Sequence, residues 1–98
     1  MSAQTIVCDA IRNRERLGFW LGFWHDDSRR EVEPHLLGYD DDGLLTLSAW
    51  QIAGGTGKGW RRFHVAKLTG LSTTGTNFSS ASSRHANNTT MVRIVCRL

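Results

Sequence analysis

The spacing of apolar residues predicts one short helix near the start of the chain. Apolar side chains recur there at helical spacing, at Ile6, Val7, Ala10 and Ile11. This spacing predicts a helix over residues 3–15 with a single apolar stripe. Ser2 or Thr5 can cap its first turn, and Gly18 follows its end. Because so short a helix is marginal on its own, we expect its stripe to pack on a sheet.

Much of the remaining chain alternates between apolar and polar positions in the manner of strands. The predicted strands cover residues 17–24, 31–39, 44–52, 60–68 and 91–98. The first of them doubles the sequence Leu-Gly-Phe-Trp, and this density of aromatic residues favours a buried strand. Pro34 cannot donate to a strand ladder, so its position belongs to a strand start, a sheet edge or a bulge. Asp42 and Gly43 are typical of a tight hairpin turn.

The strand over residues 44–52 shows the alternation most clearly. One of its faces carries Leu45, Leu47 and Ala49, and the other carries Thr46, Ser48 and Trp50. Residues 72–90, by contrast, are rich in Ser, Thr, Asn and Gly, with Phe78 as their strongly apolar residue. We expect a long polar surface loop or a partly disordered segment there.

One helix followed by about five strands predicts a mainly β fold in a single domain. A chain of 98 residues is too short for two cores of ordinary size. A sheet of about five strands has to curl to cover its own apolar face, so we expect a small, partly open barrel over residues 1–98. The expected parts are a helix over 3–15, barrel strands over 17–68, a polar loop over 72–90 and a terminal strand over 91–98.

The two cysteines lie near opposite ends of the chain, at Cys8 and Cys96. A disulfide between them would close nearly the whole chain, whereas free thiols would act as small buried hydrophobes. Both residues lie in apolar segments, and no export signal is visible. We therefore expect free thiols in the reducing cytosol, which makes the protein cytoplasmic. No membrane partner is expected either, since no run approaches the ~18–20 apolar residues of a membrane span.

Charge is unevenly divided along the chain, whose formal net charge is +3. Residues 1–42 are acidic on balance. Residues 43–98 hold no acid, and their basic residues are Lys58, Arg61, Arg62, Lys67, Arg84, Arg93 and Arg97. A sheet built partly from this second half could present a positive face that attracts phosphates, nucleotides or an acidic partner. Alternatively, its basic strands lie beside acidic ones and the field cancels locally.

Patterns that would indicate catalysis or a metal are missing from the sequence. The glycine-rich loop at 54–59 lacks the spacing of a phosphate-binding loop and the Ser or Thr that should follow Lys58. Residues 40–42, three aspartates, lack the alternating ligands of a calcium loop and read as a solvated turn. No metal-ligand spacing joins the four histidines, which are His25, His35, His64 and His85. Because no motif joins a nucleophile, a base and an orienting residue, we expect no enzyme, no metal and no cofactor.

One segment combines aromatic rings with cations. Residues 60–67 read Trp-Arg-Arg-Phe-His-Val-Ala-Lys on a predicted strand. Such a mixture can stack a nucleobase on a ring and hold a phosphate with a guanidinium. The alternative is a half-buried edge strand that turns its charges to solvent.

Several segments share their order and spacing with a known family. They are Val32-Glu33-Pro34-His35, Gly38, the segment from Leu44 to Trp50 and the segment from Gly59 to Val65. In these segments the chain resembles the WYL domain, the ligand-sensing domain of many bacterial transcription regulators, and above all its short stand-alone members. The resemblance implies an Sm-like or SH3-like small β-barrel preceded by a helix. It also implies a polar pocket that takes nucleotides, nucleic acid or another anionic effector.

The resemblance further implies a set of ligand contacts. By position they are His35, Arg61, His64 and Lys67. The family's namesake Trp-Tyr-Leu reads Leu-Thr-Leu here, so Thr46 takes the place of a tyrosine that helps to line the pocket.

Two functional hypotheses follow from these observations. The first is a non-enzymatic, cytoplasmic regulatory domain of bacterial type that binds a nucleotide or single-stranded nucleic acid. Its implied roles are phosphate binding by Arg61 and Lys67, hydrogen bonding by His35 and His64, and base stacking by Trp50 or Trp60. The second is a protein-interaction module or a homodimer, because four Trp and four Phe exceed what a small core hides.

Overall fold

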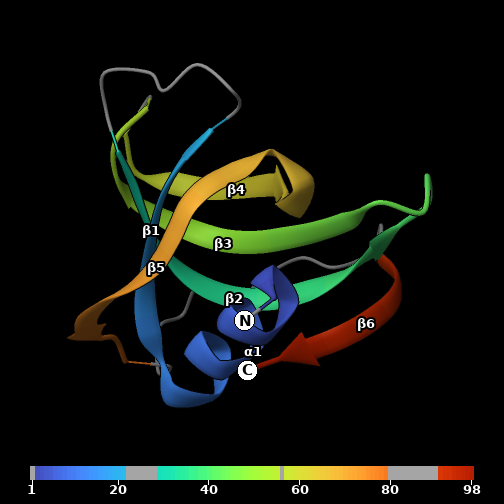
Figure 1. Cartoon of the computed structure of the whole chain (residues 1–98), viewed down its shortest axis with the longest axis horizontal. Coiled ribbons are helices and arrows are strands. Elements are labelled where there is room, and N and C mark those ends of the chain that lie inside the picture. The colour runs from blue at the N-terminus through green and yellow to red at the C-terminus, as the bar shows by residue number, and fades with distance from the viewer. Residues whose placement is uncertain (1, 22–28, 56, 80–90) are drawn as a thin grey trace.

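A computed structural model of the chain describes residues 2–21, 29–55, 57–79 and 91–98. Within these residues it contains one α-helix, six strands and a short 3₁₀ turn, η1 (Figure 1). Their bounds are α1 (Ala3–Asn13), β1 (Glu15–Leu21), β2 (Arg30–Asp40), β3 (Leu45–Ala53), β4 (Gly59–His64), η1 (Val65–Lys67), β5 (Leu68–Asn77) and β6 (Met91–Arg97).

The strands form one curved antiparallel sheet that does not close into a barrel. Five of them lie in the order β4-β3-β2-β1-β5, and β6 pairs with β2 as well. β3 pairs along nearly all of β2, whereas β1 pairs with residues 30–32 and β6 with residues 36–40. β1 and β6 therefore share the second edge of β2, one after the other. The expected mainly β fold with an N-terminal helix is confirmed, and the described residues form six strands rather than about five.

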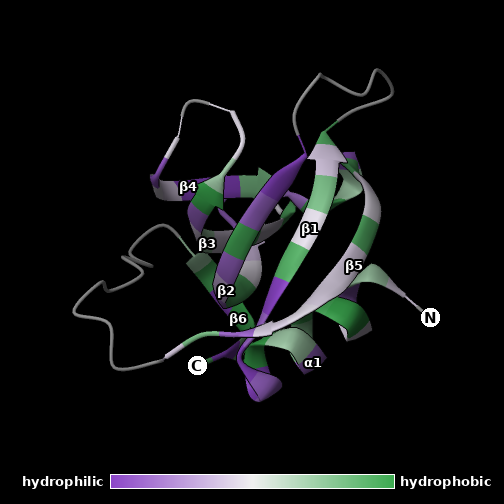
Figure 2. Cartoon of the chain, turned by 90° about the vertical axis from the view of Figure 1, so that its left-hand side faces the viewer, coloured by the Kyte–Doolittle hydropathy of each residue, from purple (hydrophilic) through white to green (hydrophobic). Residues whose placement is uncertain are grey.

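α1 lies against the sheet (Figure 2), and the apolar stripe of the helix belongs to the core. Its fully buried residues are Val7, Ala10 and Ile11. Ser2 caps the helix, since its Oγ accepts a hydrogen bond from the backbone N–H of Thr5 at 3.2 Å. The helix ends at Asn13 rather than residue 15, because Arg14 adopts a left-handed conformation with φ of 54°. Among the described residues, no helix is both long and apolar enough to cross a membrane.

The curved sheet and α1 enclose one apolar core. Phe19 of β1 and Phe63 of β4 meet there edge to face, with ring centroids 5.0 Å apart. Since β1 and β4 are separated by two strands in the sheet, this contact requires the sheet to curl. The predicted alternation of β3 is confirmed, because Leu47 and Ala49 are buried in this core while Trp50 lies on the other face.

Pro34 lies in the middle of β2, which has partners on both edges. The register against β3 shifts between Pro34 and Leu36. Pro34 thus stands beside a bulge, and on the second edge of β2 it falls between the residues that pair with β1 and those that pair with β6. A bulge removes the need for the N–H that proline lacks.

β5 is longer than the composition indicated. The prediction of a loop that starts at residue 72 is wrong for its first residues, because β5 continues to Asn77 and pairs with β1. A strand ladder is made by backbone groups, and threonine suits strands, so a polar segment can extend a sheet without apolar side chains. Residues 80–90 of the expected loop lie outside the described residues.

β4 is shorter than expected, and β1 begins earlier. The strand predicted over 60–68 ends at His64, and η1 follows it. η1 leads from β4 to β5, which lie at opposite ends of the strand order, so the chain has to turn there. β1 starts at Glu15 instead of residue 17, and residues 22–24 of its predicted course fall outside the described part of the chain.

The expectation of free thiols is wrong, because Cys8 and Cys96 form a disulfide that ties α1 to β6. Their Cα atoms are 5.8 Å apart, within the usual range for such a bond. The packing of α1 against β6 brings the two sulfurs to the same place. The local pattern that suggested a buried residue was correct for Cys8, which is 7% exposed, but it carried no information about pairing.

Gly38→Ala is expected to lower the free energy of unfolding by about 1–3 kcal/mol, because an added methyl group overpacks the contact between β2 and β6. A Cβ at Gly38 would lie 2.6 Å from the carbonyl oxygen of Arg93. Gly43→Asn is the matched control, since Gly43 has open space around it and asparagine tolerates its φ of 77°. Urea unfolding measures both variants, and equal destabilisation by the two would contradict the close approach of β6.

Candidate functional site

Most of the residues that the sequence singled out lie on one surface of β2, β3 and β4. This surface, which we call the outer face, points away from the core. The register of β3 and β4 pairs Trp50 with Trp60, Ser48 with Arg62 and Thr46 with His64. Because alternate residues of a strand share a face, these six side chains lie together on the outer face.

An aromatic row crosses the outer face. Trp50 and Trp60 meet edge to face with ring centroids 5.6 Å apart, and Trp60 meets His35 in the same way at 4.9 Å. Phe78 continues the row beyond His35 at 5.4 Å. His35 is buried and its Nδ1 lies 2.7 Å from the carbonyl oxygen of Glu33, so the centre of the row is fixed. The two tryptophans are half-buried, which leaves part of each ring in contact with solvent.

A second cluster forms around Asp40 at the other end of β4. Its Oδ1 accepts hydrogen bonds from the backbone N–H groups of Asp42 and Leu44, both at 2.9 Å. Its Oδ2 accepts one from the Thr46 hydroxyl at 3.3 Å and lies 3.6 Å from Nε2 of His64. The Leu44 N–H in particular, helped by Asp42, Thr46 and His64, holds the pKa of Asp40 below its ordinary value of 3.8 against an opposing effect of desolvation.

Asp40→Asn is expected to lower the melting temperature at neutral pH, because it removes a carboxylate that the fold stabilises. Asparagine keeps an oxygen that can accept the turn N–H groups, so the variant tests the charge. A carboxyl group whose pKa is lowered by folding adds stability above its unfolded pKa, and this is lost as pH falls through the folded value. The difference from the parent should therefore be present in full above about pH 4 and shrink progressively as pH falls below it. Thermal melts across this range test it, and a difference independent of pH would contradict it; Asp41→Asn, exposed in the same turn, is the control.

The glycine-rich loop before β4 is held from inside by Gln51 and Arg61. Nε2 of Gln51 donates to the carbonyl oxygens of Gly54 at 2.9 Å and Gly57 at 2.7 Å. Arg61 lies on the core side of β4, and its guanidinium donates to the carbonyls of Trp60 at 3.0 Å and Gly57 at 3.3 Å. These hydrogen bonds hold the described residues of the loop in a defined turn.

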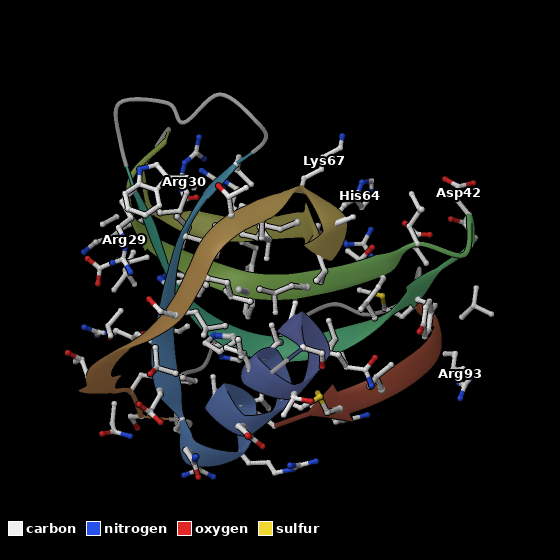
Figure 3. The ribbon with its side chains drawn as sticks, in the orientation of Figure 1. Arg29, Arg30, Asp42, His64, Lys67 and Arg93 are labelled. Atoms are coloured by element: carbon white, nitrogen blue, oxygen red, sulfur yellow. A yellow bond between two sulfur atoms is a disulfide. The ribbon has the colours of Figure 1, made fainter. Side chains whose placement is uncertain are left out.

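Basic side chains gather at this loop end of the sheet. The guanidinium of Arg30 occupies the space that a side chain on Gly55 would need. Arg29 lies over the ring of Trp20 at 5.4 Å, and Lys58 is exposed. Figure 3 shows Arg29 and Arg30 at the opposite end of the sheet from Asp42. Basic side chains are thus found at the loop end, and three aspartates lie in the turn at the opposite end.

The predicted contact residues do not form a single cluster. Three of them belong to the aromatic row, and two lie beside Asp40. Arg61 faces the other side of β4 and folds onto the loop, while Lys67 is exposed on η1 (Figure 3). The two imidazoles are in different surroundings, since His35 packs on an indole and His64 faces a carboxylate.

Two cavities border α1 rather than the outer face. One, of about 240 Å³, lies between α1 and Val95 of β6. The other, of about 410 Å³, lies between α1 and residues 71–73 of β5. Neither is lined by a predicted contact residue.

Three features of the outer face are absent from the contacts predicted from the sequence. Arg62, rather than Arg61, shares this face with Trp60. The carboxylate of Glu33 accepts from Arg16 at 3.1 Å, which neutralises an acid next to the aromatic row. Phe78 covers His35. The alternation of the predicted strand already groups Arg62 with Trp60, but the resemblance assigned the phosphate contact to Arg61 by position.

No family model, curated protein or solved structure matches this chain.

Proposed function

We propose that this chain is a non-catalytic domain that binds single-stranded nucleic acid along β4. One observation carries the proposal: Trp60 and exposed Arg62 alternate on the outer face, and exposed Lys58 precedes them. Alternate residues of a strand are about 7 Å apart. At this spacing, rings can stack on the bases and cations can contact the phosphates of an extended nucleic-acid strand.

The aromatic row supports base stacking. Trp50 and Trp60 are half-buried and brace each other at 5.6 Å, and buried His35 holds Trp60 from behind. A ring that is already fixed loses little conformational entropy when a base stacks on it. Stacking of this kind contributes about 1–3 kcal/mol per base without strong sequence preference.

The charges support an anionic ligand. Residues 43–98, which supply β3 and β4, contain no acid. The carboxylates of Glu33 and Asp40, which neighbour the outer face, lie beside Arg16 and His64 respectively. Local cancellation by neighbouring acids, the alternative that the sequence left open, is therefore weakened at Glu33, whereas the lowered pKa of Asp40 keeps that carboxylate charged at the far end of β4.

A regulatory role as a WYL-like ligand sensor remains part of this proposal, on the strength of the motif resemblance. The outer face and the resemblance agree on an anionic ligand, and both involve His35. The cytoplasmic location is a prediction from the sequence that the disulfide weighs against, because such bonds persist in oxidising compartments. Thiol labelling of the protein in its native cells distinguishes the two locations, because the cysteines would be labelled in a reducing cytoplasm and protected by the disulfide in an oxidising compartment.

Titration of a labelled oligothymidylate by fluorescence anisotropy tests the proposal. Binding should be clear at low salt, and the logarithm of the affinity should fall linearly with the logarithm of salt concentration. Arg62→Ala should reduce the slope by about 0.7, the share of one phosphate contact. Arg97→Ala, an exposed arginine on β6, is the matched control and should leave the slope unchanged. Absence of binding at low salt, or equal effects of the two variants, would contradict the proposal, and a mononucleotide competitor distinguishes a nucleotide ligand from a strand.

A further inference from the structure

The smaller of the two cavities beside α1 borders the disulfide. Its volume is about 240 Å³, and its lining consists of Gln4, Thr5, Cys8, Asp9 and Arg12 on α1 and Val95 on β6. Gln4, Thr5 and Arg12 are exposed, so the cavity is open to solvent. Cys8 itself is only 7% exposed, and Cys96 does not belong to the lining. The cavity is therefore a route by which a small molecule reaches the disulfide from the side of Cys8.

The lining of this cavity carries one acid and one base side by side. Nη1 of Arg12 donates to Oδ1 of Asp9 at 3.1 Å, and the two side chains are 68% and 48% exposed respectively. An ion pair this exposed contributes little stability, so a ligand can take the place of either partner at small cost. The ammonium and carboxylate groups of a free amino acid are complementary to an aspartate and an arginine in this arrangement. The cavity therefore suits a small zwitterion better than a molecule with charge of one sign.

We propose that a small amino-acid thiol, of the class of free cysteine, enters this cavity and exchanges with the disulfide at Cys8. The thiol reacts as its thiolate, whose sulfur bonds to Sγ of Cys8 while the bond between Cys8 and Cys96 breaks. The electron pair of the broken bond leaves on Sγ of Cys96, which takes up the proton that the entering thiol lost. The disulfide itself is the oxidant, so the step needs no further reagent. Its products are a mixed disulfide at Cys8 and a free thiol at Cys96, and α1 is then no longer tied to β6.

The surroundings of the disulfide favour this reagent and this sulfur. The thiol of another protein is attached to a chain too large for a cavity of about 240 Å³. Cys96 is half-buried, but it packs against the apolar core and lies outside the cavity, so the amino-acid thiol meets Cys8 first. The free thiol of Cys96 can attack the mixed disulfide and close the original bond again. The exchange is therefore a reversible modification whose extent follows the concentration of the small thiol.

The rate at which free cysteine opens the disulfide of the full oxidised chain tests this inference. Acid quenching, alkylation and mass spectrometry measure this rate in native buffer, with mercaptoethanol as an uncharged reference thiol. The rate should rise in proportion to cysteine concentration, because entry into the cavity requires no unfolding. Asp9→Asn and Arg12→Gln together should lower the ratio of the cysteine rate to the mercaptoethanol rate about threefold or more, because two exposed charge contacts are lost. Asp41→Asn with Arg93→Gln is the matched control, since it removes the same charges from exposed positions elsewhere, and it should keep the ratio of the parent.

Single-cysteine variants of the full chain test which sulfur reacts. The apolar stripe of α1 belongs to the core, so the helix and the cavity beside it should persist without the disulfide, and circular dichroism checks this. The probe is cystine, the disulfide of free cysteine. Cys8 in the Cys96→Ser variant should displace one half of cystine and form the mixed disulfide about tenfold faster than Cys96 does in the Cys8→Ser variant.

Three outcomes would overturn the inference. One is a rate of disulfide opening that does not depend on cysteine concentration, since the exchange would then wait for unfolding. Another is a ratio of the two thiol rates that the changes at Asp9 and Arg12 leave unaltered. The third is a Cys96 that reacts with cystine as fast as Cys8, because the cavity would then not select the sulfur.

Discussion

Replacement of Cys8 and Cys96 together by serine is expected to lower the free energy of unfolding by roughly 4–5 kcal/mol in the chain-entropy model. The disulfide joins residues separated by 88 positions, so it restricts almost the whole unfolded chain. A domain of this size is stabilised by only about 5–15 kcal/mol in total. The loss should therefore move the urea midpoint far toward zero, which equilibrium unfolding measures directly.

The helix α1 should remain docked in the serine variant, since Val7, Ala10 and Ile11 are fully buried without help from sulfur. Far-UV circular dichroism of the folded variant should accordingly match that of the parent. The parent in the presence of a reductant is the internal control and should unfold at the same urea concentration as the variant. A reduced parent that is as stable as the oxidised one would contradict a stabilising disulfide, and two reactive thiols in the unreduced denatured chain would contradict its existence.

The parts of the fold that local pattern determines were predictable. The 3.6-residue spacing in α1 and the alternation in β3 each reflect one element with one buried face, and both were found. The turn at residues 40–43 was also found, because aspartate and glycine favour its backbone geometry and Gly43 has φ of 77°. In each case the sequence that encodes the element lies within the element.

The features that depend on distant partners were not predictable. A buried thiol and a buried half-cystine have the same apolar surroundings, and only the packing of α1 on β6 distinguishes them. The polar residues of β5 become a strand because β1 offers them a backbone ladder. Neither partner is visible in the local pattern, so composition predicted a thiol and a loop instead.

In the candidate site, too, some features follow from local pattern and others do not. Trp50 and Trp60 were correctly grouped because both lie on well-patterned strands. Arg61 and Arg62 are neighbours in the sequence but lie on opposite faces of β4, and alternation places Arg62 with Trp60, while the register with β3 adds Trp50 to that face. The resemblance transferred Arg61 by position, whereas the geometry of the outer face favours Arg62 as the phosphate contact.

Trp60→Leu is expected to weaken binding of the labelled oligothymidylate about fivefold or more, because a stacked base contributes about 1–3 kcal/mol. Leucine keeps apolar volume against His35 but has no ring face to offer. Trp60→Phe is the matched variant, and it should bind within about threefold of the parent because it keeps a smaller ring face. Fluorescence anisotropy at a fixed low salt concentration measures both, and thermal melts confirm that both variants are folded.

The salt dependence of these variants distinguishes stacking from charge. Trp60→Leu removes no phosphate contact, so its affinity should fall at every salt concentration while the slope against salt stays that of the parent. Arg62→Ala should instead reduce the slope against salt, and its loss of affinity relative to the parent should become smaller as salt concentration rises. If Trp60→Leu changed the slope, or bound as tightly as Trp60→Phe, the ring would not stack on a base and Trp60 would serve only to brace Trp50 and His35. A Trp50→Leu variant should then show whether the neighbouring ring is the platform, because Trp50 is half-buried on the same face 5.6 Å away.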